Sequence, residues 1–513
     1  MFTITDFFCG AGGSSQGLHR VPGLEVVIAA NHWDLAVQSH ALNFPGCEHD
    51  CADISQIDFR RYPRTDFHWG SPECTNHTVA RGVRMDADRQ PDLFGELLPT
   101  EAAVRSRATM WDIPRYLEAM WMRGKPTLGG VVENVIDVTR WIFFPSWTQA
   151  LSALGYRWRV VFLNSMFAQP RFGSQRAPQS RDRAYVVYWL ESLGREPQWE
   201  KWLSPPALCP EHGTVAARQV FNNGVEWGRY RAQYRYVCPI TGCGATVYPP
   251  ALPAAAAIRW DRPGMRIGDR KRPLAAKTLA RVESGLRRYG GRPIAVPMEG
   301  RDGKSPWGLD DEPLRTQTTR QDLALAHLPD GFRSEFLPFI AEMRGGGSEK
   351  KARGVDEAMC TVTASGNHHA LVTAPPLLVP VGGTWRETAA PVTQPMGART
   401  TRETDALLVP YYGTGRARPA GQPLGTLTTK DRYALVTGHD SVPIPAVDDC
   451  YLRMLDPDEI GTGMAFETEY RLLGNRRERV RQLGNAVTPP AAEILGCLLV
   501  ETVTGEDLFS LAS

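Results

Sequence analysis

The sequence predicts an α/β protein with a doubly wound, mostly parallel sheet and a second, irregular β-rich domain. The first 190 residues alternate short apolar runs with stretches of helical spacing, the pattern of strands and helices that follow one another. From residue 191 the chain becomes rich in Pro, Gly, Arg and Thr and loses sustained periodicity. A chain of 513 residues can form two or three packed units. We therefore expect domains at 1–190 and 191–445, and a returning segment at 446–513.

The individual elements of the first domain follow from these runs. Apolar, β-branched or aromatic stretches predict buried strands, and amphipathic stretches between them predict helices. The strands are expected at 2–8, 26–30, 67–70, 131–132, 157–163 and 184–189, and the helices at 33–42, 110–122 and 145–154. In such a sheet, ligands bind at the carboxyl ends of the strands.

Composition limits the class of protein only broadly. The net charge is only +2, so the protein is not of the strongly basic kind that coats nucleic acid through its whole surface. Of the 58 basic residues, 50 are Arg and 8 are Lys. Arg binds phosphates and guanine edges better than Lys does, because its guanidinium donates two parallel hydrogen bonds. The codon usage of a GC-rich genome explains the excess of Arg over Lys equally well. Ten cysteines in a chain of this length do not suggest a secreted disulfide scaffold.

Membrane signals are weak in the sequence. No apolar run approaches the roughly 18 residues of a membrane span, and no basic region precedes the first apolar stretch. We expect a cytoplasmic protein with no membrane partner.

Five short motifs fall at the ends of predicted strands or near the end of the chain. The first is a glycine-rich turn, and the second holds Cys74 in a Gly-Ser-Pro-Glu-Cys sequence. The others contain an acid, two arginines and a Gly-Asn pair. In chain order they are 6–13, 70–78, 133–135, 178–183 and 484–487.

In this order the motifs resemble motifs I, IV, VI, VIII and X of the DNA cytosine-C5 methyltransferases, and residues 453–459 resemble motif IX. The resemblance covers roughly 1–190 and 446–513. It implies a Rossmann-like S-adenosylmethionine-dependent methyltransferase fold acting on double-stranded DNA. It also implies that 191–445 is the target-recognition domain and that a C-terminal helix folds back onto the cofactor domain. We expect a monomer. The sequence does not decide whether a cognate restriction endonuclease exists.

The resemblance also implies catalytic roles. Cys74 would attack C6 of cytosine, because a covalent bond there makes the unreactive C5 electron-rich. Glu133 would supply the proton at N3, and Arg181 and Arg183 would fix the cytosine O2 and the carboxylate through fork-like hydrogen bonds. A stacked base is out of reach, so it must be flipped out of the duplex.

The same resemblance assigns a cofactor site for S-adenosylmethionine. Its residues come from the glycine turn, the ends of the next two strands, the Cys74 loop and the C-terminal motif. They are Phe8, Gly10, Ala11, Gly12, Gly13, Asn31, His32, Asp53, Ile54, Pro72 and Asn485.

The chain departs from the family pattern in two places, beside the cysteine and at the end of the second strand. The family has Pro immediately before the cysteine and Gln after it, whereas this chain has Glu73 and Thr75. A carboxylate aimed at the thiol would raise its pKa, so we expect Glu73 to point away. Asn31 stands where an acidic residue normally holds the cofactor ribose, which removes a charge-assisted hydrogen bond.

A separate group of residues predicts a structural zinc site in a ribbon element at 205–250. Two ligand pairs of the kind that zinc prefers are separated by a β-rich loop. They are Cys209 with His212 and Cys238 with Cys243. The alternative is four unconnected residues, because cysteines are common in cores. Between the pairs, 227–236 interleaves arginines with aromatic residues, which fits either a nucleic-acid contact or an alternating strand.

Weak repeats follow in the recognition segment. Three stretches beginning at Asp311, Asp356 and Gln422 share a pattern that ends in a Thr-rich turn. Their spacing is irregular, so we expect short β-units rather than a solenoid.

Two other functions fit the same fold. An RNA cytosine methyltransferase is one, although the long recognition segment disfavours it. A catalytically silent DNA-binding protein is the other, favoured by Glu73 and Asn31.

Overall fold

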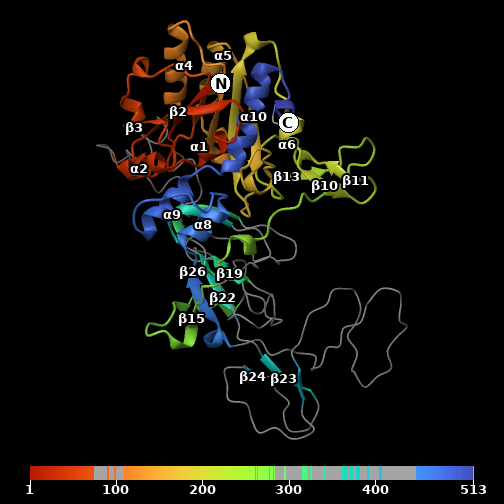
Figure 1. Cartoon of the computed structure of the whole chain (residues 1–513). Helices are drawn as coiled ribbons and strands as arrows, with labels where there is room; N and C mark the ends of the chain where they lie inside the picture. Colours follow the sequence, from red (N-terminus) through yellow and green to blue (C-terminus); the bar gives the residue numbers. More distant parts are fainter. Residues whose placement is uncertain are drawn as a thin grey trace.

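The computed structural model describes residues 1–73, 109–259 and 446–511 continuously, and shorter stretches elsewhere, including most of 261–283 and several strands between 89 and 406. Its main feature is a seven-stranded sheet of order β3-β2-β1-β4-β7-β9-β8 (Figure 1). The strands are β1 Phe2–Phe7, β2 Leu24–Asn31, β3 Glu48–Cys51, β4 Phe67–Gly70, β7 Gly129–Asn134, β8 Tyr156–Asn164 and β9 Asp182–Leu190.

The sheet is parallel except for β9. The four pairings from β3 to β7 are parallel, while β9 runs antiparallel to both β7 and β8. The predicted doubly wound, mostly parallel sheet is therefore confirmed. An antiparallel β9 brings its first residues, Asp182 and Arg183, to the edge where the parallel strands β4 and β7 end.

Helices cover both faces of this sheet. The strands alternate their side chains between the faces, so Ile4 and Val131 belong to one apolar cluster and Phe7 and Val132 to the other. One face is covered by α1 Gly13–Leu18 and α10 Pro489–Thr504, and the other by α4 Asp112–Met122 and α5 Phe144–Ala153. The helix α2 Asp34–Asn43 contacts β2 and β3.

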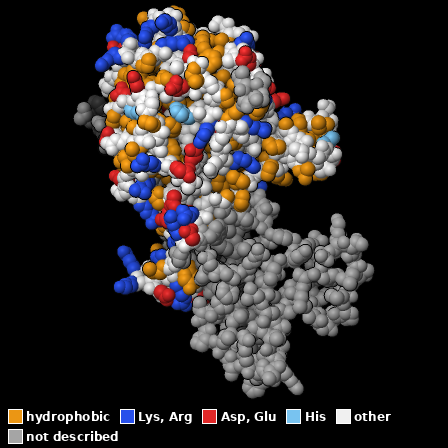
Figure 2. Space-filling view, in the orientation of Figure 1, with side chains coloured by type: hydrophobic (Ala, Val, Ile, Leu, Met, Phe, Trp, Pro, Cys, Tyr) orange, Lys and Arg blue, Asp and Glu red, His pale blue; other side chains and the backbone are white. Residues whose placement is uncertain are grey.

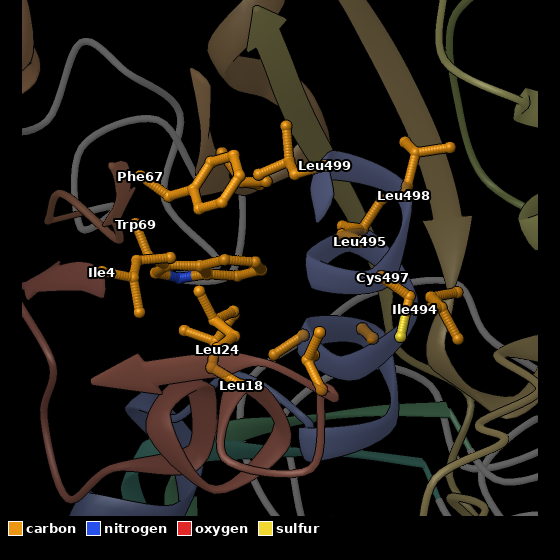
Figure 3. Packing of buried hydrophobic residues seen from close by; sticks show 14 of the residues in the cluster. Ile4, Leu18, Leu24, Phe67, Trp69, Ile494, Leu495, Cys497, Leu498 and Leu499 are labelled. Carbon is orange, nitrogen blue, oxygen red and sulfur yellow. The ribbon is translucent and has the colours of Figure 1, made fainter. Parts of the chain in front are cut away.

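The C-terminal helix α10 is a core element of the first domain. Leu495, Leu498 and Leu499 face Phe67 and Trp69 of β4 across one cluster (Figure 3). By length and composition Arg476–Thr504 could cross a membrane, but 94% of its most apolar window is buried inside the protein. The expected return of the C-terminal segment onto the first domain is what buries this helix.

Among the strands of the seven-stranded sheet and the helices that cover it, β3 and α1 were not predicted. The strand β3 has the sequence Glu-His-Asp-Cys and lies at the end of the sheet, where its polar side chains need no apolar partner. The helix α1 has six residues and begins at Gly13, so it is too short to produce a periodic signal.

Residues 206–247 form the ribbon, a small unit of two sheets. One pairs β10 Pro206–Cys209 with β11 Gly213–Ala216, and the other contains β12 Arg218–Phe221, β13 Tyr234–Val237 and β14 Thr246–Val247. The ribbon lies beside the first domain and follows β9 through the short helix α6 Trp199–Leu203 (Figure 1).

The rest of the recognition segment is described only in part. A six-stranded sheet has the order β15-β26-β18-β22-β16-β19. Its strand β26 Tyr451–Met454 comes from the segment expected to return to the first domain, so the chain joins this sheet before it returns through α8 Pro457–Gly463 and α9 Arg476–Asn485. The other strands are β15 Met265–Arg266, β16 Ile294–Ala295, β18 Ala324–Leu325, β19 Phe339–Glu342 and β22 His369–Thr373.

The first two predicted repeats pair with each other. The strands β17 Arg315–Gln321 and β21 Cys360–Asn367 run parallel, with Arg315 opposite Cys360. The third repeat, at 422–429, lies outside the described residues. Elsewhere β23 Leu377–Val381 pairs with β24 Ala390–Pro391 and β25 Thr404–Ala406, and β5 Arg89–Pro91 pairs with β6 Leu97–Pro99.

Two histidines in the first domain are buried and neutral. Burial lowers the pKa of His68 to about 3 and that of His40 to about 3. His68 lies on β4 with Nδ1 2.8 Å from the Tyr188 hydroxyl, and His40 lies on α2 with Nε2 2.9 Å from the Ser15 hydroxyl. Both rings must take up a proton when the domain unfolds in mild acid.

We therefore expect acid to destabilise this domain through His68. The pKa of His68 is lower in the folded state than its ordinary value of 6.5, so its contribution is present above pH 6.5 and is lost as the pH falls toward about 3. The slope is about 1.4 kcal/mol per pH unit. In His68→Gln, chemical unfolding followed between about pH 6 and pH 4 should lose this slope. The exposed His32→Gln is the control, and parallel profiles for His68→Gln and the wild type would contradict the assignment.

Candidate active site

The predicted motifs meet at the carboxyl edge of the sheet. Ala30, Phe7, Gly70 and Val132 lie side by side in four neighbouring strands. The next residues are Asn31, Phe8, Ser71 and Glu133. Each lies within one residue of the end of its strand, at one edge of the sheet. Sequence segments separated by more than a hundred residues are brought to one row by the parallel register.

The glycine turn after β1 uses backbone angles that L side chains rarely adopt. Phe8, Gly10 and Gly12 have φ of 57°, 53° and 96°. A Cβ on Gly10 would meet no atom within 4 Å, so the turn leaves open space at this point. A Cβ on Gly13 would lie 2.1 Å from the Val487 carbonyl oxygen, so this glycine allows the C-terminal motif to touch the turn.

Hydrogen bonds fix the turn from both sides. The Asp6 carboxylate accepts from the hydroxyls of Ser14 and Ser15 at 2.6 and 2.7 Å, which ties the start of α1 to β1. Burial raises the pKa of Asp6 to about 6. On the other side, the Tyr470 hydroxyl donates to the Ala11 carbonyl. The turn is held rigid while the space beside Gly10 stays open, which suits a bound cofactor.

The loop that leads to Cys74 is fixed at its start. Asn134 donates from Nδ2 to the Pro72 carbonyl oxygen at 3.3 Å, and Ser71 donates its N–H to the Phe7 carbonyl at 3.0 Å. Cys74 itself lies outside the described residues. Two residues before it, the loop is thus tied to the strand that carries Glu133.

Glu73 faces the end of β2. Its carboxylate oxygen lies 3.7 Å from Nε2 of His32, and both side chains are partly exposed. Asn31, by contrast, accepts the Trp33 N–H at 2.9 Å and so caps its own turn. The two departures from the family pattern therefore come together on one side of the site.

Glu133 and Arg183 form a buried ion pair. Arg183 Nε lies 2.8 Å from Glu133 Oε1, and the two side chains are 11% and 9% exposed. Arg183 also donates from Nη1 to the Asp182 carbonyl at 3.0 Å. The guanidinium thus holds the carboxylate at the strand edge, while the predicted catalytic roles of both residues stay predictions.

Arg181 has different partners. Its Nη2 atom donates to the carbonyl oxygens of Gly484 and Ala486 at 3.2 and 2.9 Å. Arg181 is buried, and the carbonyls belong to the C-terminal motif on either side of the exposed Asn485. The described contacts of Arg181 therefore join motif VIII to motif X, and its predicted contact with cytosine stays a prediction.

The remaining predicted cofactor residues lie at the same edge but differ in exposure. Asp53 caps a short 3-10 helix by accepting the Ser55 N–H at 3.2 Å. Ile54 is 1% exposed and packs in the apolar cluster on the α4 side. Its side chain thus supports the site from the core.

The four predicted zinc ligands come together in the ribbon. Their ligand atoms all lie within 4.8 Å of one another. Cys209 Sγ is 3.8 Å from Cys243 Sγ and 3.6 Å from His212 Nδ1, while Cys238 Sγ is 3.7 Å from His212 Nδ1. A tetrahedral zinc with Zn–S bonds of about 2.3 Å separates its sulfurs by about 3.8 Å. The hydrogen bond with His212 lowers the pKa of Cys209 to about 6, which favours the thiolate. These residues fit a zinc ion.

The stretch 227–236 contacts the first domain. Its end forms β13, so the strand interpretation is confirmed there. Trp227 stacks against Arg140, whose Cζ lies 3.3 Å from the ring centroid, and Tyr236 packs edge-on against Phe167 at 5.2 Å. The described contacts of these aromatic rings are therefore made within the protein.

Comparison with known proteins finds one family model that matches part of the chain. Residues 2–100 match the model of the C-5 cytosine-specific DNA methylases, a stretch that holds both the glycine turn and the Cys74 loop. In this stretch the chain is similar to that family. Its members transfer a methyl group from S-adenosylmethionine, so the open space beside Gly10 lies where the family implies the cofactor. A comparison with curated proteins gives no match.

Solved structures give a distant likeness. A prophage-encoded E. coli protein described as a DNA modification methyltransferase has 14% identity and a TM-score of 0.43, covering 98% of this chain and 99% of its own. Dnmt2 of S. pombe has 12% identity and a TM-score of 0.45, covering 98% and 99%. DNMT2 of Spodoptera frugiperda, as a triple mutant, has 12% and 0.43, covering 98% and 100%. The likeness to the C-5 cytosine-specific DNA methylases therefore depends on the matched residues 2–100.

Sequence reasoning missed three residues that support the site. Asn134 holds the Cys74 loop, Tyr470 holds the glycine turn, and Asp182 separates the two arginines. Asn134 and Asp182 lie inside recognised motifs, so their position was a usable signal. Tyr470 lies in a loop 459 residues away from Ala11 and gave none.

Two glycines of the turn should respond differently to alanine. Gly13→Ala places a methyl group against a backbone carbonyl, so we expect a loss of about 1–3 kcal/mol in unfolding free energy. Gly10→Ala meets no atom but adopts φ of 53°, so it should cost about 1 kcal/mol and block the space where the cofactor is expected.

Thermal unfolding and calorimetric titration with S-adenosylmethionine separate the two effects. Gly10→Ala should lose affinity while staying folded, and Gly13→Ala should lose stability first. Unchanged affinity in a folded Gly10→Ala protein would place the cofactor elsewhere.

Proposed function

We propose that the protein methylates C5 of cytosine in double-stranded DNA. The observation that carries the proposal is the buried ion pair between Glu133 of β7 and Arg183 of β9. Asn134, which follows Glu133 on β7, binds the start of the loop that leads to Cys74. A carboxyl group next to the start of the Cys74 loop suits attack on a pyrimidine ring, in which one group protonates the ring while the other adds to it.

The proposed reaction begins with the Cys74 thiolate. Glu133 first takes up a proton from water. The thiolate then forms a bond to C6, the ring electrons move toward N3, and Glu133 passes its proton to N3, which returns it when the ring is restored. Electron density is then available at C5, where the methyl group is attached. Loss of the C5 proton to a base and departure of the thiolate restore the aromatic ring. Arg183 keeps the Glu133 carboxyl in place throughout.

S-adenosylmethionine supplies the methyl group as a sulfonium when it is bound. The glycine turn leaves space for it beside Gly10, and Asp6 and Tyr470 keep that turn in shape. Asn31 has its side-chain oxygen engaged with Trp33, which leaves the Asn31 amide N–H groups to meet cofactor hydroxyls.

The choice of DNA over RNA depends on the recognition segment. We propose that 191–445 reads the target's base edges, because Thr- and Arg-rich β-units suit thymine methyls and guanine edges in a major groove. The substrate base would be flipped out to reach Cys74. We further propose a cytoplasmic monomer that binds no membrane.

Covalent trapping tests the reaction and the substrate together. Wild-type protein incubated with S-adenosylmethionine and duplex DNA containing 5-fluorocytosine should form a stable adduct, because fluorine at C5 cannot leave as a proton. Cys74→Ala should form none while still binding S-adenosylmethionine. Glu133→Gln should slow adduct formation by about 100-fold or more, since an amide cannot supply the proton.

The outcomes separate the three functions. Trapping on matched 5-fluorocytosine RNA and not on DNA would assign an RNA enzyme. No trapping on either, by a protein that binds duplex DNA, would assign a silent DNA-binding protein. Near-normal methylation by Cys74→Ala would contradict the proposed attack of Cys74 on C6.

We also propose that the ribbon holds one structural zinc ion through Cys209, His212, Cys238 and Cys243. The sulfur and nitrogen separations support tetrahedral binding. Elemental analysis of protein purified without added metal should give about one zinc per chain. Cys238→Ser should lower the zinc content and the stability of the ribbon, because three ligands close the site poorly.

Cys497→Ser is the matched control, because Cys497 is buried in α10 and belongs to the apolar core. It should keep its zinc. A wild-type protein without zinc that is fully active would overturn the proposal.

A further inference from the structure

We infer that the ribbon is a brace for the catalytic strand, and that Asp182 and Asp137 are the positioning residues through which it acts. The inference rests on the proposed function, since it assigns a role to the ribbon in the same reaction. Its observations are separate, because they are contacts between the ribbon and the backbone on either side of the catalytic pair.

The first contact is made by the residue between the two arginines. Asp182 Oδ1 accepts the Tyr230 N–H at 3.1 Å and the Tyr234 hydroxyl at 3.2 Å. Asp182 is the first residue of β9, and Arg183 follows it directly. A strand end has few ladder partners of its own, so a carboxylate anchored to the ribbon fixes where Arg183 leaves the backbone.

The second contact lies on the Glu133 side. Arg229 of the ribbon forms an ion pair with Asp137 at 2.7 Å, with side-chain exposures of 32% and 18%. Asp137 belongs to the short helix η6 Ile136–Arg140, which begins three residues after Glu133. Arg140, at the end of the same helix, stacks on Trp227. One turn of the ribbon therefore holds both halves of the Glu133–Arg183 pair.

The turn that makes these contacts is itself tightly shaped. Arg231 adopts φ of 65°, and its N–H donates to the Tyr234 carbonyl at 2.7 Å. The Arg229 N–H donates to Gln233 Oε1 at 2.9 Å. A residue other than glycine in the left-handed region indicates a turn whose shape its surroundings impose.

The four predicted zinc ligands lie next to this turn through the strand β13. Tyr234 and Tyr236 lie on β13, and Cys238 follows that strand by one residue. Both tyrosines are buried, in a cluster that also holds Cys209 and Phe167. Phe167 lies just after β8 and packs edge-on against Tyr230 at 4.7 Å. A metal that ties Cys238 to Cys209 thus connects the ribbon's fold to the catalytic strands.

These contacts predict a specific kinetic signature. A misplaced Arg183 leaves the carboxyl of Glu133 poorly aimed, and misplacement by about 1 Å can cost about 100-fold in rate. The ribbon residues named here face the first domain, so their loss should lower kcat and leave the KM for DNA unchanged. A ribbon that grips nucleic acid through the same residues would instead raise the KM.

The experiment compares four variants of the full-length, zinc-loaded chain. Asp182→Ala removes the acceptor, while Asp182→Asn keeps an oxygen that can accept both hydrogen bonds. Arg229→Ala breaks the second contact. Arg235→Ala is the control, because Arg235 lies on the same ribbon, is exposed and bonds to Asn222 at 2.6 Å.

We expect kcat for duplex DNA to fall by about 10- to 100-fold in Asp182→Ala and Arg229→Ala. Asp182→Asn should stay within about threefold of the wild type, as should Arg235→Ala, in line with the small effect of surface substitutions. The KM for DNA and the affinity for S-adenosylmethionine should not change in any of the four.

A second measurement keeps the inference independent of activity. Amide hydrogen exchange in residues 181–185 and 134–138 should speed up in Asp182→Ala and Arg229→Ala, and in the wild type after zinc is removed with a chelator. Unchanged exchange together with unchanged kcat overturns the brace. A raised KM with normal kcat assigns the ribbon to DNA binding instead. If the wild type forms no cytosine adduct, the proposed function fails, while the exchange result still decides the brace.

Discussion

The buried ion pair between Glu133 and Arg183 is the constraint on which the rest of the site depends. Moving two charges out of water costs several kcal/mol each, and the attraction between them offsets that cost only when both are held in good geometry. Loss of either partner would leave a charge stranded in the sheet. The pair therefore needs a rigid frame. The parallel register of β4 and β7 supplies one side of it, and the antiparallel β9 supplies the other.

Segments far apart in the sequence hold the surroundings of the pair in place. Asn134 ties the Cys74 loop to the strand of Glu133, and Arg181 ties the start of β9 to the carbonyls of Gly484 and Ala486. The C-terminal helix α10 buries its leucines in the cluster that contains Phe67 and Trp69 of β4 (Figure 3). Its apolar length thus reflects a place in the core, and the last motif reaches the glycine turn because that helix is anchored there.

Much of this arrangement could be predicted from the sequence, for identifiable reasons. The apolar run 26–30 predicted a strand because buried parallel strands are apolar on both faces, and it lies in β2, which is parallel to both of its neighbours. The edge strand Glu48–Cys51 has no such run, and a helix of six residues has no period. The zinc ligands were found from spacing alone, since each close pair is local. The contacts of Arg181 and Asp182 could not be found in this way, because they depend on which distant backbone lies opposite each side chain.

Several aromatic and basic residues of the ribbon make their described contacts within the protein. Trp227, Arg229, Tyr234 and Tyr236 all make contacts inside the protein, with Arg140, Asp137, Asp182 and Phe167. On the described part of the face in Figure 2, basic and acidic side chains are interspersed over the first domain. A side chain already held in an ion pair or a stacked contact has to break it before it can bind a phosphate. For Arg229 the partner to be broken is Asp137, which lies in the short helix η6 just after the strand of Glu133.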